Sequence, residues 1–161
     1  IAELSSIDAR TMEKALDTPV FGNGTCSLDY DMFDTERPAL LAAKKDLTNI
    51  MRAAVGTEVY ISESFFNIYR SDSGIREHDH LNELDQDERL NLKVQKFSLA
   101  YYITVGDQNC AEPGYLRLLD PSENVLPTEG MVVIFPADRK HSAVYNGKKE
   151  RMMLGINFYA L

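Results

Sequence analysis

The chain contains three histidines, and their spacing is suited to binding one metal ion. His78 and His80 are separated by a single residue, and His141 follows much later in the chain. Side chains two residues apart in a strand point to the same side, so both imidazoles of the first pair can reach one ion. Imidazole is a ligand for iron, zinc, copper and nickel. The histidines therefore predict a mononuclear metal site, and three unrelated surface or hydrogen-bonded histidines are the alternative.

The segments that must position these histidines have the pattern of a β-rich domain. From Pro38 to Val55 apolar residues recur every three or four positions, which predicts a helix that Asp34 or Thr35 caps and Gly56 ends. After Gly56 the apolar period changes to two, which predicts strands. Many strands at short spacing indicate a β-sandwich or barrel, with the helix packed on one outer face. The predicted strands are Glu58–Ser62, Phe65–Arg70, Val94–Val105, Tyr115–Asp120, Met131–Pro136, Ser142–Tyr145 and Arg151–Tyr159.

The longer predicted strands each have an apolar face and a face of small or polar residues. Tyr69 and Tyr102 fall on polar faces, which suits the lining of a pocket. The last strand shows the alternation most fully. Its apolar face carries Met152, Leu154, Ile156 and Phe158, and its other face carries Arg151, Met153, Gly155 and Asn157.

Length and composition set the limits of the assignment. The 161 residues correspond to a single domain, with 1–57 as helical or irregular support and 58–161 as the barrel. The net charge of -8 makes nucleic acid an unfavoured partner. No apolar run approaches the length of a membrane span, and two cysteines without a C-x-x-C pattern favour a reduced, cytoplasmic protein. The oligomeric state is left open, a homodimer included.

From about Phe65 to its C-terminus the chain resembles the 2-oxoglutarate/Fe(II) oxygenase superfamily, in particular a prolyl-hydroxylase-like subgroup. The family pattern is a proximal His-x-acid pair, a distal histidine and a basic residue about ten positions later. The segments that carry the resemblance are 74–80, 98–103, 129–136 and 141–151. The resemblance implies a mainly β double-stranded β-helix, a cupin-like jelly-roll barrel.

The same resemblance implies the roles of six residues. His78, His80 and His141 would hold Fe(II) and form the catalytic centre, and Arg151 would bind the far carboxylate of the co-substrate 2-oxoglutarate. Tyr69 and Tyr102 match tyrosines that line the co-substrate pocket in the subgroup. The implied reaction hydroxylates a substrate and consumes dioxygen while 2-oxoglutarate is decarboxylated. The substrate, a small molecule or a protein side chain, is not identified by the sequence.

Two positions depart from the family pattern. His80 stands where the usual pair has an aspartate, so a bulged strand bringing in Asp79, Glu83 or Asp85 is the alternative. Three neutral imidazoles leave the metal its full double charge, which favours a dianionic co-substrate. Met153 stands where many relatives carry a hydroxyl residue, which removes one expected hydrogen bond to the co-substrate.

Three other functions are open on the sequence. A cupin-type metal enzyme that does not use 2-oxoglutarate fits His-x-His, but its second motif fits poorly, because ten residues lie between Gly130 and His141. A zinc site with three histidines and a water is the second alternative, since ligand type does not separate iron from zinc. A non-enzymatic jelly-roll binding module is the third.

Overall fold

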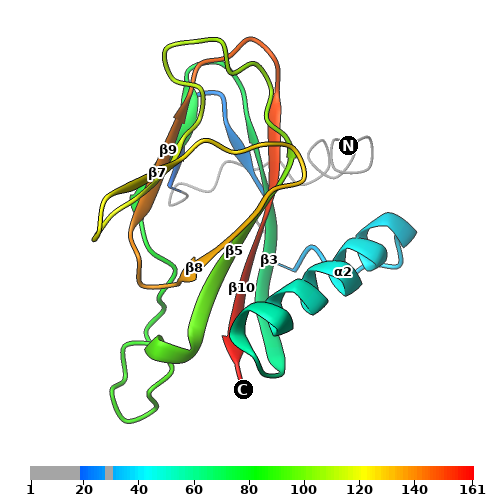
Figure 1. Ribbon diagram of the computed structural model, residues 1–161, viewed down its shortest axis with the longest axis vertical. Coiled ribbons are helices and arrows are strands. Elements are labelled where there is room, and N and C mark those ends of the chain that lie inside the picture. Colours follow the sequence, from blue (N-terminus) through cyan, green and yellow to red (C-terminus); the bar gives the residue numbers. More distant parts are fainter. Residues whose placement is uncertain (1–18, 28–30) are drawn as a thin grey trace.

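The computed structural model describes residues 19–27 and 31–161, which form two five-stranded antiparallel sheets (Figure 1). Strands that are distant in sequence are neighbours in both sheets, as in a jelly roll. The mainly β fold predicted from the sequence is confirmed. The first sheet has the order β1 (Val20–Phe21), β4 (Ser73–His78), β9 (His141–Tyr145), β6 (Leu116–Leu118) and β7 (Glu123–Val125). The second has the order β2 (Thr25–Cys26), β3 (Val59–Tyr69), β10 (Arg151–Ala160), β5 (Lys96–Thr104) and β8 (Val132–Pro136).

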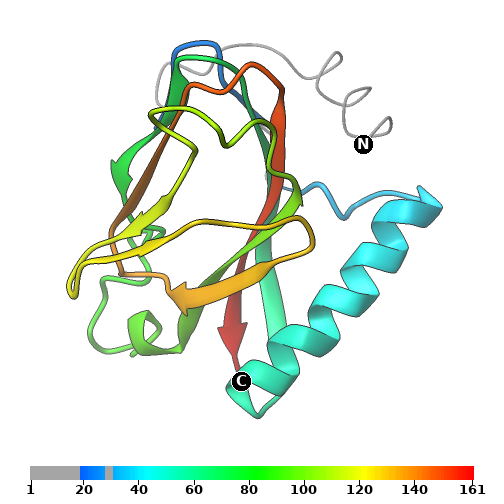
Figure 2. The same ribbon diagram turned by 45° about the horizontal axis from the view of Figure 1, so that its top comes forward.

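One long helix, α2 (Pro38–Val55), covers the outer face of the second sheet (Figure 2). Its buried residues Leu40, Leu47 and Met51 pack against the apolar faces of β3 and β10. Each buried side chain of this kind contributes about 1.5–3 kcal/mol of transfer free energy. Gly56 ends the helix in the left-handed conformation, with φ of 74°, as predicted. The predicted capping residues are wrong, because the helix begins after Arg37 and no side chain caps it.

The alternation predicted for the strands is confirmed. The face of β10 that carries Leu154 and Ile156 belongs to the core beneath α2, together with Phe66 and Ile68 of β3. The opposite faces of the same strands point between the two sheets. They carry buried polar side chains that line an inner cavity, among them Asn67, Tyr69, Ser98, Tyr102, Arg151 and Asn157.

Strand β3 contains a bulge that the sequence did not predict. Asn157 of β10 pairs with Glu63 and the next residue, Phe158, pairs with Ile61, so Ser62 is left out of the ladder. The Ser62 hydroxyl donates a hydrogen bond to the carbonyl of Asn157 at 3.1 Å. The segments predicted as two strands, Glu58–Ser62 and Phe65–Arg70, are therefore one strand with a local change of phase.

Strand β4 corrects the expected placement of the proximal histidines. No strand was predicted between Arg70 and Val94, but β4 begins at Ser73 and ends at His78. His80 lies beyond the strand, where its backbone N–H donates to the carbonyl of Ala137 at 2.9 Å. The two imidazoles are thus brought together by a strand end and the following loop. The sequence also missed β1, β2 and β7, which have two or three residues each.

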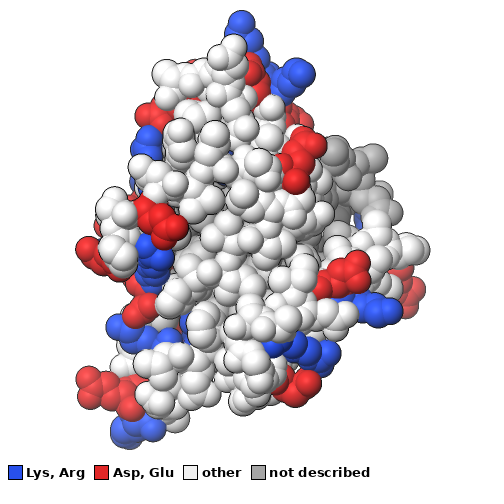
Figure 3. Space-filling view, viewed as in Figure 1, with Lys and Arg blue, Asp and Glu red and all other residues white. Residues whose placement is uncertain are grey.

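The charged side chains are distributed in mixed groups. On the face drawn in Figure 3, Lys and Arg lie beside Asp and Glu, mostly toward the outline. No continuous basic area is visible among the described residues of this face. In the described ranges no helix is both long and apolar enough to span a bilayer.

Candidate metal centre and co-substrate cavity

His78, His80 and His141 converge on one point between the sheets. One ring nitrogen from each lies within 4.8 Å of the others. The Nε2 atoms of His80 and His141 are 3.3 Å apart. Metal–nitrogen bonds of about 2.1 Å place neighbouring ligands at about 3 Å from one another, so the group needs little adjustment to hold an ion. Antiparallel pairing of His78 with His141 produces this juxtaposition.

Backbone carbonyls orient two of the three rings. His78 Nδ1 lies 2.8 Å from the carbonyl of Arg76, and His141 Nδ1 lies 3.3 Å from the carbonyl of Arg139. Each Nδ1 therefore carries the proton, and each Nε2 is left with its lone pair. His78 Nε2 is buried and has no hydrogen-bond partner. A buried, unpartnered ring nitrogen that faces two other imidazoles fits a metal ligand.

The protein environment keeps these imidazoles neutral. Burial, followed by the neighbouring His78, lowers the pKa of His141 to about 4, against the opposing effect of the Arg139 carbonyl. The pKa of His80 is lowered well below its usual range by burial and then by His141, His78 and Lys96. Burial also lowers the pKa of His78. Neutral imidazoles are the form that binds metal, so the site is prepared for an ion at neutral pH.

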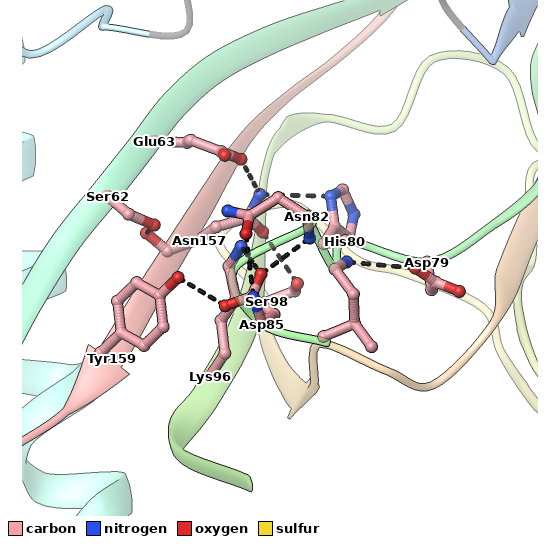
Figure 4. A network of polar contacts seen from close by, with 11 residues as sticks. Ser62, Glu63, Asp79, His80, Asn82, Asp85, Lys96, Ser98, Asn157 and Tyr159 are labelled. Carbon is pink, nitrogen blue, oxygen red and sulfur yellow. Dashed lines mark hydrogen bonds and ion pairs between the residues drawn. The ribbon is translucent and has the colours of Figure 1, made fainter. Parts of the chain in front are cut away.

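Asn157 connects His80 to a carboxylate (Figure 4). Its Nδ2 lies 3.2 Å from His80 Nδ1 and also donates to Glu63 Oε2, while its Oδ1 accepts from the Ser98 hydroxyl at 2.8 Å. The side chain is 1% exposed and is held on three sides. This arrangement fixes the plane of the His80 ring, since partners behind a metal ligand set its orientation.

A second network anchors the loop that carries His80. Asp85 forms an ion pair of 2.7 Å with Lys96 and accepts a hydrogen bond of 2.6 Å from the Tyr159 hydroxyl (Figure 4). The backbone N–H of Asn82 also donates to Asp85, at 2.8 Å. The side chains of Lys96 and Asp85 are fully buried. Despite the burial, these hydrogen bonds lower the pKa of Asp85, which stays ionised and ties the loop to β5 and β10.

The carboxylates considered as alternative ligands lie elsewhere. Asp85 is engaged with Lys96, Asp79 Oδ1 accepts from the backbone N–H of Leu81 at 3.1 Å, and Glu83 is exposed. In the described part of the chain, the only group of three or more His, Cys, Asp or Glu residues with ligand atoms close enough to share an ion is the three histidines. The geometry favours His80 itself as the third ligand.

Arg151 is buried in a cavity that His80 and His141 also line. The residue is 1% exposed, and its Nη1 donates to the carbonyls of Gly114 and Pro113. Its Nε has no hydrogen-bond partner, and no carboxylate of the described residues forms an ion pair with the guanidinium. A buried cation without a counterion is costly, so the position fits a group that receives an anion.

Two tyrosines flank the guanidinium. Its central carbon lies 5.0 Å from the ring centre of Tyr102 and 5.7 Å from that of Tyr69. Burial raises the pKa of both hydroxyls, and the positive charge of Arg151 opposes the rise. Both remain neutral hydroxyls that can donate to a carboxylate. The structure thus brings all six residues predicted for the site to the inside of the barrel, five of them around one cavity and His78 beside it.

The cavity is narrow. It has a volume of about 30 Å³, which accommodates one or two water molecules. A five-carbon dicarboxylate is larger, so its binding requires the lining side chains to move apart. Met153, which is only partly buried, lines the cavity, and its flexible thioether can give way.

Gly114 makes room for the arginine. Its φ is +84°, and a Cβ at this position would lie 1.6 Å from Arg151 Nη1. Only glycine combines this backbone conformation with so close an approach.

Sequence reasoning missed several residues at the site. Asn157 had been placed on the polar face of its strand, but no role had been assigned to it. Gly114 stands in a Glu-Pro-Gly segment, which is typical of a turn and carries no sign of a contact with an arginine. The ion pair between Lys96 and Asp85 joins residues of a strand and a loop, so no short-range pattern could have revealed it.

Comparisons with known proteins bear on the whole fold. No protein-family model and no curated protein matches the sequence. Solved structures do match. A Pseudomonas putida prolyl-4-hydroxylase has a TM-score of 0.66 and 21% identity, over 99% of this chain and 83% of that chain. The chain has the jelly-roll fold of these oxygenases.

Two further structures agree. An oxidoreductase of the 2OG-Fe(II) oxygenase family from Burkholderia pseudomallei has a TM-score of 0.64 and 16% identity, over 98% of this chain and 78% of that chain. The collagen prolyl hydroxylase of Paramecium Bursaria Chlorella virus-1, in complex with 2OG, has a TM-score of 0.62 and 8% identity, over 99% of this chain and 88% of that chain. The resemblance predicted from four sequence segments therefore extends to the arrangement of the whole barrel.

Proposed function

We propose that the chain is an iron(II)- and 2-oxoglutarate-dependent dioxygenase that hydroxylates its substrate. The observation that carries the proposal is the buried guanidinium of Arg151, which has no carboxylate partner among the described residues and lines the same cavity as His80 and His141. A three-histidine metal site alone would suit many reactions. A metal site that shares its cavity with a cation for a dicarboxylate is much more specific.

Each residue has a distinct task in this proposal. His78, His80 and His141 hold Fe(II), which supplies the redox chemistry that couples dioxygen to decarboxylation. Arg151 would bind the far carboxylate with two parallel hydrogen bonds, and Tyr69 and Tyr102, whose rings flank the guanidinium, would line the same part of the cavity. Asn157 holds the plane of the His80 ring. The small cavity excludes bulk water, which strengthens these electrostatic contacts.

The charges agree with the proposal. Three neutral imidazoles leave the metal with two positive charges, and Arg151 adds a third in the same cavity. A dianionic keto acid that contacts both ends neutralises most of this charge. The His-x-His variant therefore favours the co-substrate more strongly than a site with a carboxylate ligand does.

The test is spectroscopic. Anaerobic addition of iron(II) and 2-oxoglutarate to the full chain should give a visible charge-transfer band, and Arg151→Ala should abolish it. Arg89→Ala, which removes a guanidinium that is almost fully exposed, is the matched control and should leave the band intact. The absence of any band in the wild-type protein would overturn the proposal.

Zinc is separated from iron by a second measurement. Protein purified without oxygen should contain iron, and restoring metals one at a time should restore 2-oxoglutarate decarboxylation with iron(II) alone. His141→Ala should lose the metal. Activity on a substrate with 2-oxoglutarate omitted would favour a cupin-type enzyme instead.

A further inference from the structure

A second cleft adjoins the candidate metal centre. It has a volume of about 240 Å³ and is more open than the inner cavity. His78 and His80 line it, and it shares four residues with the inner cavity: Phe65, Asn67, Ile75 and His80. Arg151 belongs only to the inner cavity. The position and size of the cleft suit the part of a substrate that must lie next to the metal.

The ionised groups of this cleft are all acidic. Glu63 and Asp79 line it, and no lysine or arginine does so among the described residues. Glu63 Oε2 accepts from Asn157, and Asp79 Oδ1 accepts from the backbone of Leu81. Each carboxylate keeps further acceptor sites beyond these bonds, because an ionised carboxylate has about four lone pairs.

A third acceptor in the same wall has no partner. Asn67 is 2% exposed, and its Nδ2 donates to the Tyr69 hydroxyl at 3.3 Å. Its Oδ1 is buried without any hydrogen bond. Buried polar atoms are nearly always satisfied, so an orphan acceptor in a cleft that two carboxylates also line points to a donor that arrives with a ligand.

We propose that the substrate group received beside the metal is an organic cation, such as a protonated amine or a guanidinium. Glu63 supplies the opposing charge and Asn67 a neutral acceptor. The inference rests on the proposed function for its use of the metal centre. The two ends of the site then differ in sign, because the inner cavity carries Arg151 for the dianionic co-substrate and the outer cleft carries carboxylates. This difference in charge directs the dianionic co-substrate to the inner cavity and the cationic substrate group to the outer cleft.

An organic cation explains the cleft better than a second metal ion does. Glu63 and Asp79 belong to no group of three or more close metal-binding side chains in the described part of the chain. The remaining wall is largely apolar, with Phe65, Ile75 and Leu81. Hydrocarbon next to carboxylates matches an alkyl chain that ends in an ammonium group.

The test compares three small probes of similar size on the full chain loaded with zinc, which is redox-inert. The probes are pentylamine, pentanol and pentanoate, and binding is followed by NMR shifts of the backbone amides around Glu63. Pentylamine should bind about tenfold or more tightly than pentanol, and pentanoate weakest, because a hydrogen bond to a charged group is stronger than a neutral one. Equal binding of all three, or preference for pentanoate, would overturn the proposal.

Glu63→Gln isolates the charge. The amide keeps an acceptor for Asn157 while removing the carboxylate, so the preference for pentylamine should be lost. Glu129→Gln removes an exposed carboxylate outside the cleft and should leave the preference unchanged. If Glu63→Gln does not fold, Asp79→Asn should still reduce the preference. Mg²⁺ alone shifting the same amides as pentylamine would indicate a metal site and contradict the inference.

Failure of this inference and failure of the proposed function give different results. Loss of the iron(II)–2-oxoglutarate band with a Glu63-dependent amine preference intact would remove the oxygenase assignment only. A normal band without any amine preference would remove the substrate class only.

Discussion

Two buried cations of this protein differ in their partners. Lys96 and Arg151 are each 1% exposed. Lys96 forms an ion pair with Asp85 at 2.7 Å, and the Tyr159 hydroxyl satisfies the other carboxylate oxygen. Arg151 donates to two backbone carbonyls and lies against the rings of Tyr69 and Tyr102, and its Nε is unsatisfied. The first cation is fully paired within the described part of the chain, whereas the second is left without a carboxylate there.

The difference separates stability from function. A fully paired buried charge holds a loop in place, and removing one partner leaves the other uncompensated. An unpaired buried charge costs folding free energy, which binding of an anion recovers. Measurements on the two cations should therefore respond in opposite senses.

The largest effect is expected at the complete pair. Asp85→Ala leaves Lys96 buried and unpaired, and should lower the free energy of unfolding by about 3–5 kcal/mol in urea denaturation. The double variant Asp85→Ala with Lys96→Met should recover much of the loss, because no isolated charge remains. A loss below about 1 kcal/mol in the single variant would show that water or rearrangement satisfies the lysine.

The next largest effect is the pH dependence of stability that the three histidines produce. Their folded pKa values are lowered from the ordinary value near 6.5, to about 4 for His141. The unfolded chain binds more protons between pH 4 and 6.5, so the metal-free protein should be most stable above pH 6.5 and lose stability toward pH 4. His141 alone accounts for roughly 3 kcal/mol over this window.

Urea denaturation of metal-free protein at several pH values checks this slope. His141→Gln should flatten it, because the neutral amide has no proton to gain. A stability that is constant from pH 6.5 to pH 4 would contradict the assignment of neutral, buried imidazoles.

The unpaired cation should gain stability from its ligand. With metal bound, 2-oxoglutarate at 100 times its dissociation constant should raise the free energy of unfolding of the wild type by about 3 kcal/mol. Arg151→Met should lose this gain, while its stability without 2-oxoglutarate stays equal or rises. Thermal unfolding with and without the co-substrate measures both. If Arg151→Met destabilised the ligand-free protein as strongly as Asp85→Ala, the two cations would not differ in the proposed way.

The smallest effect is expected at Gly114, whose missing side chain leaves room for Arg151. Gly114→Ala places a methyl group on the guanidinium, so it should weaken 2-oxoglutarate binding and cost about 1–2 kcal/mol of stability. Gly130→Ala is a close control, since Gly130 has a φ of +80° with nothing within 4 Å of the added carbon. Gly130→Ala should lose stability through backbone strain, but its affinity for 2-oxoglutarate should not change. Calorimetric titration of both variants makes the comparison.

The sequence predicted what depends on local pattern. The period-two alternation correctly assigned the faces of β3, β5 and β10, because one side of this sheet packs on a helix and the other lines a cavity. Helix α2 followed from its apolar stripe and the glycine at its end. The histidines were found because their number is small and their spacing specific.

The sequence could not predict what depends on distant pairing. Strand β4 is short and polar, with Glu77 and Arg76 exposed, so its sequence resembles a loop until β9 pairs with it. The contact of Asn157 with His80 joins residues from a strand and a loop 77 positions apart. The closeness of Gly114 to Arg151 likewise depends on the closed barrel.

The extra residue at Ser62 determines which side chains of β3 face α2 and which face the cleft. Alternation counted back from Tyr69 would turn Ile61 toward the barrel interior, yet Ile61 packs against the core beneath α2 while Glu63 faces the cleft. The unpaired serine thus shifts the alternation, so that Val59 and Ile61 face the core beneath α2 on the same side as Phe66 and Ile68. If β3 instead paired regularly through Ser62, inside and outside would be exchanged along its first half, and Ile61 would lie on the same side as Glu63, in the cleft.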